Sequence, residues 1–397
     1  MSVQPSSTEE QSTPKDKQDE ALKSISPGRI AIAVAAGLIV IVYLFIQDFS
    51  LEDFQKISWN PKTLYWIAGA FFFVLLRHFA YMFRLRTITQ GFFSWRKCFE
   101  MIFVWEFSSA VTPTSVGGSA VALVALSQEK ISPGRTTMII FYTIVLDTFF
   151  YLSSLLLLFS IFGFLIILPG TTSFSEMINQ YFGAGFFGAY LFMSIYGSLF
   201  FYGVFINAKA VHRVLMAITS LPLLRRFKEG ANKMGQDMQL ASGELRRQKW
   251  QFHLKAFGAT AGAWASRFMV LNCLIMAFIA NSTDPAVQAH YNSVLIDQQD
   301  FSLFVQQVFI VGRQIAMYVI MAIVPTPGGA GAAESSFENF HSDYLPAGGT
   351  LLLVMTIFWR FFTYYLYLFI GMIVVPNWIR KLINRNKQEA EAAQPTE

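Results

Sequence analysis

The chain has 397 residues, of which 54% are hydrophobic and only 14% charged, with 41 phenylalanines. A soluble domain of this size could not bury so much apolar surface, so the composition is typical of a polytopic membrane protein. The net charge of +5 comes from basic residues clustered in short segments between apolar runs. This pattern indicates membrane orientation and contact with lipid headgroups, and it argues against a nucleic-acid partner.

The motifs of common enzymes and metal sites are missing. Cys98 and Cys273 lie far apart, and the sequence contains neither CxxC nor HExxH, so we expect no metal site, no disulfide framework and no cofactor. A nucleophile elbow, a paired-carboxylate spacing and the GxxxxGK[ST] loop are also absent. We therefore expect a protein that is not an enzyme and does not pump with ATP by itself.

The N-terminal part predicts a tail followed by two spans. Residues 1–28 are polar and predict a disordered cytoplasmic tail. The apolar run from Ile30 starts too late for a cleaved signal peptide and predicts a signal anchor over about 30–46. A second span follows over about 63–83, and the basic segment 84–97 places the next loop, and hence the N-terminus, in the cytoplasm.

A broken apolar segment comes next. Its first arm, 99–111, has thirteen residues and covers only about 20 Å, which is too short to cross a bilayer. A break at 113–118 and a second arm at 119–127 follow, and both flanks are basic. The segment therefore predicts a helix pair that enters and leaves on the cytoplasmic side.

The central region predicts further spans around a basic excursion. Spans are expected over about 136–168, 183–206 and 256–280, and the external loops between them lack Lys and Arg. Residues 207–255 are the most basic stretch and predict a cytoplasmic helical excursion along the anionic leaflet. The simpler interpretation of this excursion is that it only fixes orientation.

A second broken segment precedes the last span. Its first arm, 303–324, is long enough to cross at about 33 Å, so spanning and re-entry both stay open. The short second arm, 330–341, favours re-entry from outside, and the last span, about 348–375, leads to a cytoplasmic tail over 381–397. We expect an all-α integral membrane protein with about six full transmembrane helices and two glycine-tipped re-entrant pairs. Such pairs, entering from opposite faces, are typical of an inverted repeat around a transport site.

Ionisable residues within the spans are the first candidate site residues, because charges in hydrocarbon are costly and point to function or pairing. They are Arg77, Glu106, Asp147, Arg267, Arg313, Glu334 and Arg360. The alternative is that they form ion pairs that only fix helix packing.

The two tips are the second group of candidates, because a helix begins after each and its first amides have no internal partner. Free N–H groups and the positive end of the helix dipole suit a phosphate, and glycines allow close approach. The alternative is that these glycines only let helices pack closely. The tip residues are Thr114, Gly117, Gly118, Pro325, Thr326, Gly328, Gly329 and Gly331.

These residues carry a family likeness. "VPTPGGAGAAESSF" at 324–337 resembles the Pro-Thr-Pro-Gly-Gly-x-Gly-x-x-Glu signature of the lysylphosphatidylglycerol synthase transmembrane family, which is flippase-like. Residues 113–123, 76–88 and 358–373 resemble other elements of that family, so the likeness covers about 30–380. The first tip departs from the family, because Ser119 and Ala122 replace an acid and an arginine, and Ser115 stands where a basic residue is common.

The resemblance implies a protein of the cell membrane, with both termini cytoplasmic, that moves or binds a lipid with an anionic, phosphate-bearing headgroup by alternating access. Glu106, Asp147 or Glu334 could couple this movement to protons. Only a short polar tail follows the last span, so the resemblance implies the translocation half without a soluble synthase domain. Two alternatives stay open: a membrane component of a lipid-linked glycosyl- or aminoacyl-transferase system, and a non-transporting partner of an envelope-assembly enzyme.

Overall fold

The computed structural model describes residues 39, 42–43, 45–112, 122–221, 225, 227–292, 302–324, 326, 328–329, 331–345 and 349–392. In this part of the chain the secondary structure is entirely helical, which confirms the all-α prediction. Six helices are long and apolar enough to cross a membrane. They are Pro61–Ile88, Pro133–Ile166, Phe182–Ile206, Trp250–Phe278, Leu303–Met321 and Gly349–Arg385.

The sequence predicted six spans and the structure has six candidate helices. Five of the predicted spans match a candidate helix, and one does not. The spans expected from 63, 136, 183, 256 and 348 onward each match one candidate helix. The sixth candidate is Leu303–Met321, which the sequence placed in the second broken segment. The expected first span, 30–46, lies mostly outside the described residues, although positions 39, 42–43 and 45–46 are helical.

The first half of the chain contains α3 (Leu51–Lys56), α4 (Pro61–Ile88), α5 (Trp95–Val111), α7 (Pro133–Phe162), α8 (Phe174–Asn179) and α9 (Tyr181–Phe201). The second half contains α10 (Ala208–Thr219), α11 (Lys228–Arg246), α12 (Trp250–Phe278), α13 (Pro285–Asn292), α14 (Leu303–Met321), α15 (Ala332–His341), α16 (Gly349–Arg360) and α17 (Leu366–Ala392). A 3-10 turn, Gly163–Ile166, extends α7, and π-turns at Tyr202–Ile206 and Phe361–Tyr365 extend α9 and join α16 to α17. Polar side chains cap several helix starts by accepting from free amides, as Asn60 does for α4 and Ser132 for α7.

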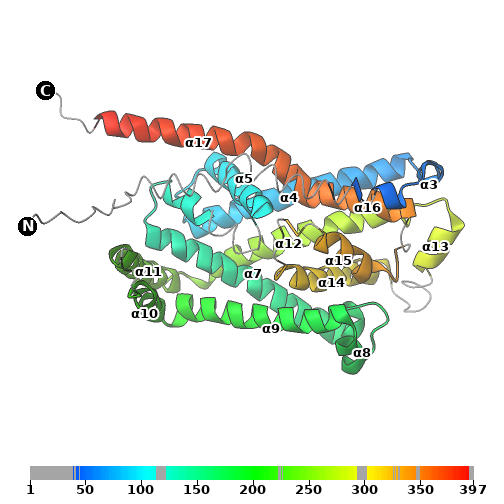
Figure 1. Cartoon of the computed structure of the whole chain (residues 1–397), viewed down its shortest axis with the longest axis horizontal. Coiled ribbons are helices and arrows are strands. Elements are labelled where there is room, and N and C mark those ends of the chain that lie inside the picture. The colour runs from blue at the N-terminus through cyan, green and yellow to red at the C-terminus, as the bar shows by residue number, and fades with distance from the viewer. Residues whose placement is uncertain are drawn as a thin grey trace, which may run out of the picture.

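Helices α4 and α12 run antiparallel and pack closely along their lengths, with α12 the more buried of the two (Figure 1). Thr63 lies beside Ala277 at one end of the pair, with its hydroxyl 3.4 Å from the carbonyl, and Arg84 lies beside Thr260 at the other. Small residues such as Ala70 and Ala263 are fully buried and let the helices approach closely. Helices α7, α9 and α14 pack together on one side, and α17 packs on α5 on the other.

The first broken segment folds as a helix hairpin. Lys97, in the first turn of α5, forms a 2.6 Å ion pair with Glu129, which follows the helical residues 122–127. The chain therefore returns to the end of the bundle at which α5 began. Residues 113–121, including the first tip, lie outside the described residues. Re-entry into a bilayer stays a prediction.

The second broken segment also turns back on itself. Arg313, in the middle of α14, donates to the carbonyl of Phe340 at 2.7 Å, near the end of α15. The ten residues of α15 thus return about half the length of α14, which agrees with an arm too short to cross. The relation of the two hairpins as an inverted repeat stays a prediction.

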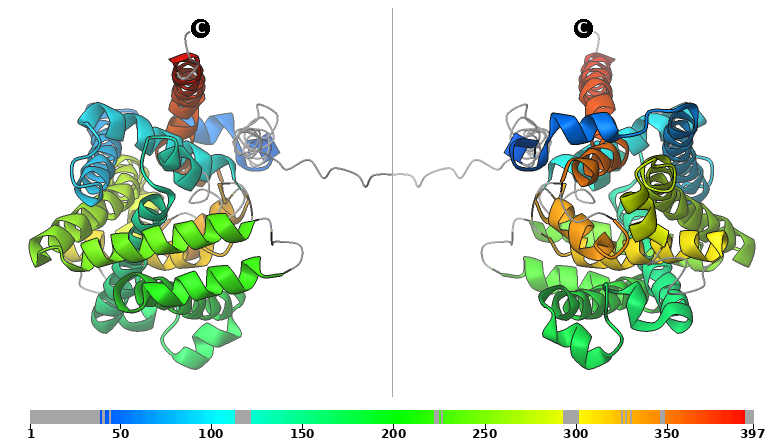
Figure 2. Two further views of the ribbon diagram at one scale, coloured as in Figure 1. Left: turned by 90° about the vertical axis from the view of Figure 1, so that its left-hand side faces the viewer. Right: turned by 90° about the vertical axis from the view of Figure 1, so that its right-hand side faces the viewer.

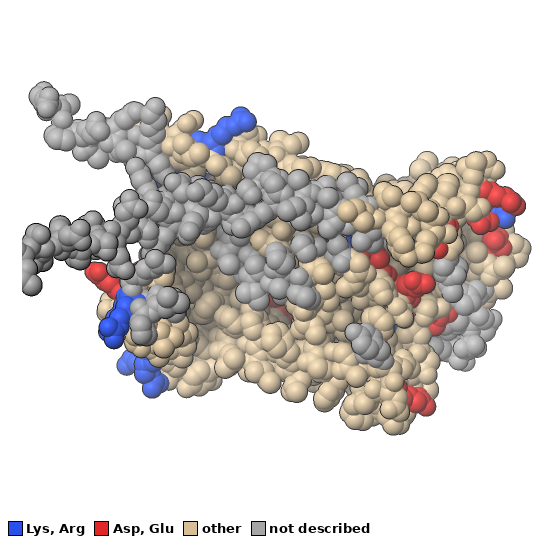
Figure 3. Space-filling view, in the orientation of Figure 1, with Lys and Arg blue, Asp and Glu red and all other residues tan. Residues whose placement is uncertain are grey.

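Charge divides the bundle into two ends. Figure 3 shows Lys and Arg gathered at the end that carries α10, α11 and the C-terminal part of α17, and Asp and Glu mainly toward the opposite end. We call these the basic end and the acidic end. Helices α10 and α11 pack against each other and lie across the basic end, seen end-on in Figure 1 and side-on in Figure 2. This placement is compatible with an excursion along a leaflet surface. The cytoplasmic location of the basic end stays a prediction from the positive-inside rule.

Candidate functional site

Arg77 on α4 joins three helices. Its guanidinium forms an ion pair with Glu106 on α5 and lies over the ring of Tyr367 on α17, 4.5 Å from the centroid. The Arg77 side chain is 1% exposed, so the carboxylate is needed to offset the loss of water around the charge. Within the described part of the chain, Arg77 Nε and the Tyr367 hydroxyl are buried without a hydrogen-bond partner.

About two turns of helix nearer the basic end, Arg84 pairs with Asp147 on α7 at 2.6 Å. Asp147 also accepts from the indole of Trp264 on α12 at 2.9 Å. These contacts hold α4, α7 and α12 together around one carboxylate. Arg77, Tyr81 and Arg84 stand at i, i+4 and i+7 on one face of α4, and both guanidiniums flank the Tyr81 ring.

Arg313 is also ion-paired. Its guanidinium, which is fully buried, contacts Asp343 at 3.1 Å and the carbonyls of Phe340 and Leu165. Asp343 was missing from the sequence-based candidates because it lies in a loop beyond α15. An acid two residues beyond a short arm was the signal available in the sequence, and it is a weak one. Through these contacts, Arg313 joins the second hairpin to the end of α7.

Arg360 holds the second tip. Its Nε donates to Glu334 at 2.6 Å, and its two terminal nitrogens donate to the carbonyls of Gly328 and Gly329 at 3.0 and 3.3 Å. Glu334 is therefore paired with Arg360, whereas Arg313 is paired with Asp343. The guanidinium fixes both the carboxylate and the glycine backbone of the tip against α16.

The tip itself requires glycine. Gly328, Gly329 and Gly331 have φ angles of 58°, 70° and 81°, which side-chain-bearing residues rarely adopt. A Cβ on Gly328 would lie 2.2 Å from the ring of Tyr364, so close packing also excludes a side chain there. A Cβ on Gly331 would meet nothing within 4 Å, so the chain is open beside this residue.

A carboxylate of the protein itself lies at the start of α15. The other carboxylate oxygen of Glu334 accepts from the Gly331 amide at 2.8 Å. It thus occupies the position that the sequence analysis assigned to a ligand phosphate. Nearby, the hydroxyl of Thr326 is buried without a hydrogen-bond partner in the described part of the chain. Thr114, Gly117, Gly118 and Pro325 lie outside the described residues.

Arg267 on α12 differs from these arginines. Its Nε donates to the hydroxyl of Tyr318 on α14 at 3.0 Å, and its guanidinium lies over the rings of Tyr318 and Trp264, 4.9 and 5.5 Å from their centroids. Within the described residues, no carboxylate lies at ion-pair distance from it. The Arg267 residue is partly exposed.

Aromatic side chains around Arg267 were missing from the sequence-based candidates. Trp264 stands one helical turn before Arg267, which was a readable signal, whereas Tyr318 comes from another helix and could not be paired with it in advance. Arg267 also interacts electrostatically with Tyr151 and Tyr367. The arrangement is a guanidinium among aromatic rings and phenol hydroxyls. Groups of three or more potential metal ligands do not occur within the described residues.

Comparison with known proteins gives the family. A family model described as "Lysylphosphatidylglycerol synthase TM region" matches residues 29–290. A UPF0104 membrane protein from Archaeoglobus fulgidus is 23% identical over 353 residues, which cover 87% of this chain and 95% of that relative. No solved structure matches the chain. The matched range includes Arg77, Asp147 and Arg267 and ends before the second tip. With its six apolar helices, this multi-pass membrane protein belongs to the lysylphosphatidylglycerol synthase transmembrane family.

Proposed function

We propose that the protein binds a lipid with a phosphate-bearing headgroup at Arg267 and moves it between leaflets. One contrast carries the proposal. Among the arginines in the interior of the candidate spans, Arg77, Arg84, Arg313 and Arg360 are each paired with a carboxylate, whereas Arg267 has none in the described part of the chain.

Physical chemistry favours an anionic ligand at this position. A guanidinium taken out of water and left without a counter-charge is costly, and residues of this kind inside membranes mark ligand paths. Aromatic rings stabilise the cation without neutralising it, so the charge stays available. The planar guanidinium matches two oxygens of a phosphate, and Nε is already directed by Tyr318, which leaves the outer nitrogens for the ligand.

Several features support movement of the lipid in addition to binding. Two helix hairpins interrupt the bundle, and irregular backbone at membrane depth is tolerated where it borders a polar cavity. The second tip carries an unsatisfied Thr326 hydroxyl and an open flank at Gly331. The family description names a phospholipid-modifying protein, which supports a phosphate-bearing lipid as the substrate class.

Native mass spectrometry in nanodiscs made from a total bacterial lipid extract tests the binding step. The wild type should retain a phosphate-bearing lipid, Arg267→Gln should lose it by about tenfold or more, and Arg267→Lys should be intermediate because it keeps charge and loses the planar fork. Lys56→Gln on the exposed α3 is the matched control for a lost charge. Equal retention by folded Arg267→Gln and wild type would contradict the proposal.

Reconstituted vesicles test the transport step. Fluorescent analogues of the retained lipid are placed in both leaflets, and dithionite then bleaches only the outer leaflet. The wild type should make the inner pool accessible and Arg267→Gln should not. If the wild type binds the lipid and never moves it, the protein is a lipid-binding partner of another membrane system and transport is ruled out.

A further inference from the structure

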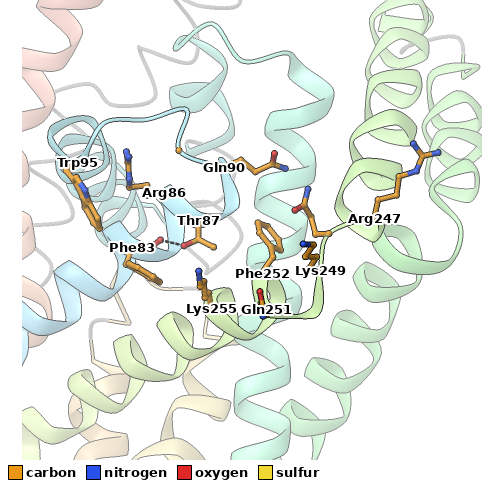
Figure 4. A pocket seen from close by; sticks show the side chains of 12 residues that line it. Phe83, Arg86, Thr87, Gln90, Trp95, Arg247, Lys249, Gln251, Phe252 and Lys255 are labelled. Carbon is orange, nitrogen blue, oxygen red and sulfur yellow. Dashed lines mark hydrogen bonds between the residues drawn. The ribbon is translucent and has the colours of Figure 1, made fainter.

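A cavity lies at the basic end, away from the interior arginines. It has a volume of about 620 Å³ and opens between the C-terminal end of α4, the loop that follows it and the start of α12 (Figure 4). We call it the rim pocket. It is lined by Phe83, Arg86, Thr87, Gln90, Gly91, Trp95, Arg247, Gln248, Lys249, Gln251, Phe252 and Lys255.

The local sequence builds one wall of the rim pocket through a tight turn. Gln90 and Gly91 adopt φ angles of 53° and 77°, and the Gly91 amide donates to the carbonyl of Arg86 at 2.9 Å. The chain therefore folds back over the end of α4. The Arg86 guanidinium lies over the Trp95 ring, 5.3 Å from the ring centroid. Arg86 also donates a hydrogen bond to the carbonyl of Phe93. Arg86 is thus held in place without a carboxylate.

The charged residues that line the rim pocket are all basic. Four of its lining residues, Arg86, Arg247, Lys249 and Lys255, are cations, and no Asp or Glu lines it in the described part of the chain. The side chains of Arg247, Lys249 and Lys255 have neither a hydrogen bond nor an ion pair there. Like charges around one cavity destabilise one another, so an anion in the rim pocket would relieve their repulsion.

Three other basic residues at the same end, Lys97, Lys381 and Arg385, are neutralised by acids. Glu129 pairs with Lys97 at 2.6 Å and with Arg385 at 3.2 Å, and Glu100 pairs with Lys381 at 2.9 Å. The absence of such acids from the rim pocket is therefore not a general property of the basic end. The lining also offers the amides of Gln90, Gln248 and Gln251 as hydrogen-bond donors.

The surroundings indicate an occupant from the bilayer. Phe79, Phe92 and Trp95 are 52%, 53% and 41% exposed, and Trp250 is 70% exposed beside the start of α12. Exposed aromatic residues of this kind next to Lys and Arg are typical of the interface between headgroups and acyl chains. A lipid could therefore place its headgroup in the rim pocket and its chains along the aromatic surface.

We propose that the rim pocket binds the phosphate of an anionic phospholipid in the leaflet at the basic end. The site is separate from Arg267, because Lys255 and Arg267 stand about 18 Å apart along the axis of α12. The proposal concerns binding at the interface and does not depend on transport.

Chemical footprinting of Lys255 tests it. The protein is placed in nanodiscs of phosphatidylcholine alone or with phosphatidylglycerol, and acetylation of Lys255 is followed by mass spectrometry. Phosphatidylglycerol should slow this acetylation by about tenfold, and the variant Arg86→Gln/Lys249→Gln should lose the protection. Lys209→Gln/Arg213→Gln on α10 removes the same charge from exposed positions at the same end and should keep the protection.

Three outcomes would overturn the proposal. Protection lost equally in both double variants would mean that the leaflet attracts the basic end diffusely, without a site. Protection by millimolar inorganic phosphate in pure phosphatidylcholine nanodiscs, matching that by phosphatidylglycerol, would assign the rim pocket to a soluble anion. Unchanged acetylation of Lys255 with phosphatidylglycerol would mean that no headgroup binds. Since Arg267→Gln should leave the protection of Lys255 intact, failure of the proposed function is recognised separately.

Discussion

Arg267 and Tyr318 form a hydrogen bond of 3.0 Å that joins α12 to α14 in the interior of the bundle. The Arg267 guanidinium lies over the Tyr318 ring, 4.9 Å from its centroid. The hydroxyl directs the Arg267 guanidinium, and this makes the loss of that hydroxyl a sensitive probe of the site.

Tyr318→Phe should weaken lipid retention and leave the fold intact. The substitution removes one hydrogen bond to a charged group and keeps the ring under the guanidinium, so a loss of about 1 kcal/mol, or about fivefold in affinity, is expected. Native mass spectrometry in nanodiscs measures it. Phe268→Leu alters a neighbouring ring that touches Tyr318 without touching the hydrogen bond, and it serves as the packing control. Equal effects of the two variants would show that Tyr318 acts through packing alone.

Glu334 and Arg360 should behave as a coupled pair. Glu334→Gln leaves a buried guanidinium without its carboxylate, which costs about 3–5 kcal/mol and should lower thermal stability in detergent. Adding Arg360→Met should recover part of that loss, because no buried charge is then left alone. Arg313→Met is the matched control and should not rescue, because its acid is Asp343. Rescue by Arg313→Met and not by Arg360→Met would contradict the assigned pairing.

These residues show which features of the structure the sequence could predict. Hydropathy and length predicted the spans, and a thirteen-residue arm predicted the first hairpin, because both depend on local properties of the chain. The sequence also identified the interior charges. Their partners depend on helix rotation and packing, so the pairing of Arg84 with Asp147, 63 positions away, could not be read in advance.

The candidate site shows the same limit. Arg267 is prominent only because the other interior arginines have carboxylates, and this contrast becomes visible once all the pairs are known. The free amides at the start of α15 were expected to face a phosphate, yet the Glu334 carboxylate folds back onto the Gly331 amide. A helix start followed three residues later by Glu often caps itself in this way, so the local sequence already carried this signal.

Gly328→Ala should destabilise the second hairpin. The residue has a φ of 58°, and the added Cβ would lie 2.2 Å from the Tyr364 ring, so a cost of about 2–5 kcal/mol is expected. Thermal unfolding in detergent measures it. Gly230→Ala on α11 is the control, because its Cβ would meet nothing within 4 Å and helix propensity favours Ala by about 0.5–1 kcal/mol. A Gly328→Ala protein as stable as wild type would show that the tip relaxes freely.

Glu129 should hold the C-terminal helix over a wide pH range. Burial alone would raise its pKa, but hydrogen bonds from Lys97 and Trp378 outweigh burial and set the pKa below the usual 4.5. A lowered folded pKa contributes stability that is present above pH 4.5 and is lost as the pH falls through the folded value. The contacts to α17 should therefore be unchanged between pH 8 and pH 5 and weaken only in stronger acid.

Fluorescence anisotropy of a label on Ile383→Cys, an exposed position of α17, follows this contact. Glu129→Gln should lower the anisotropy at every pH. Glu176→Gln, which breaks a capping box at the acidic end, should leave it unchanged. A loss of anisotropy in the wild type already near pH 6 would contradict the lowered pKa.

The orientation of the bundle gives the last prediction. Basic residues collect at one end and acids mainly toward the other, and the positive-inside rule places the basic end in the cytoplasm (Figure 3). Ser173, before α8, and Lys233, on α11, stand toward opposite ends of the bundle (Figure 1). A cysteine at 173 should react with a membrane-impermeant maleimide in intact cells, and a cysteine at 233 only after permeabilisation. Cys98 and Cys273 are buried, so the wild-type protein should label weakly and provides the background. Labelling of position 233 in intact cells would invert the topology and would place the rim pocket in the outer leaflet.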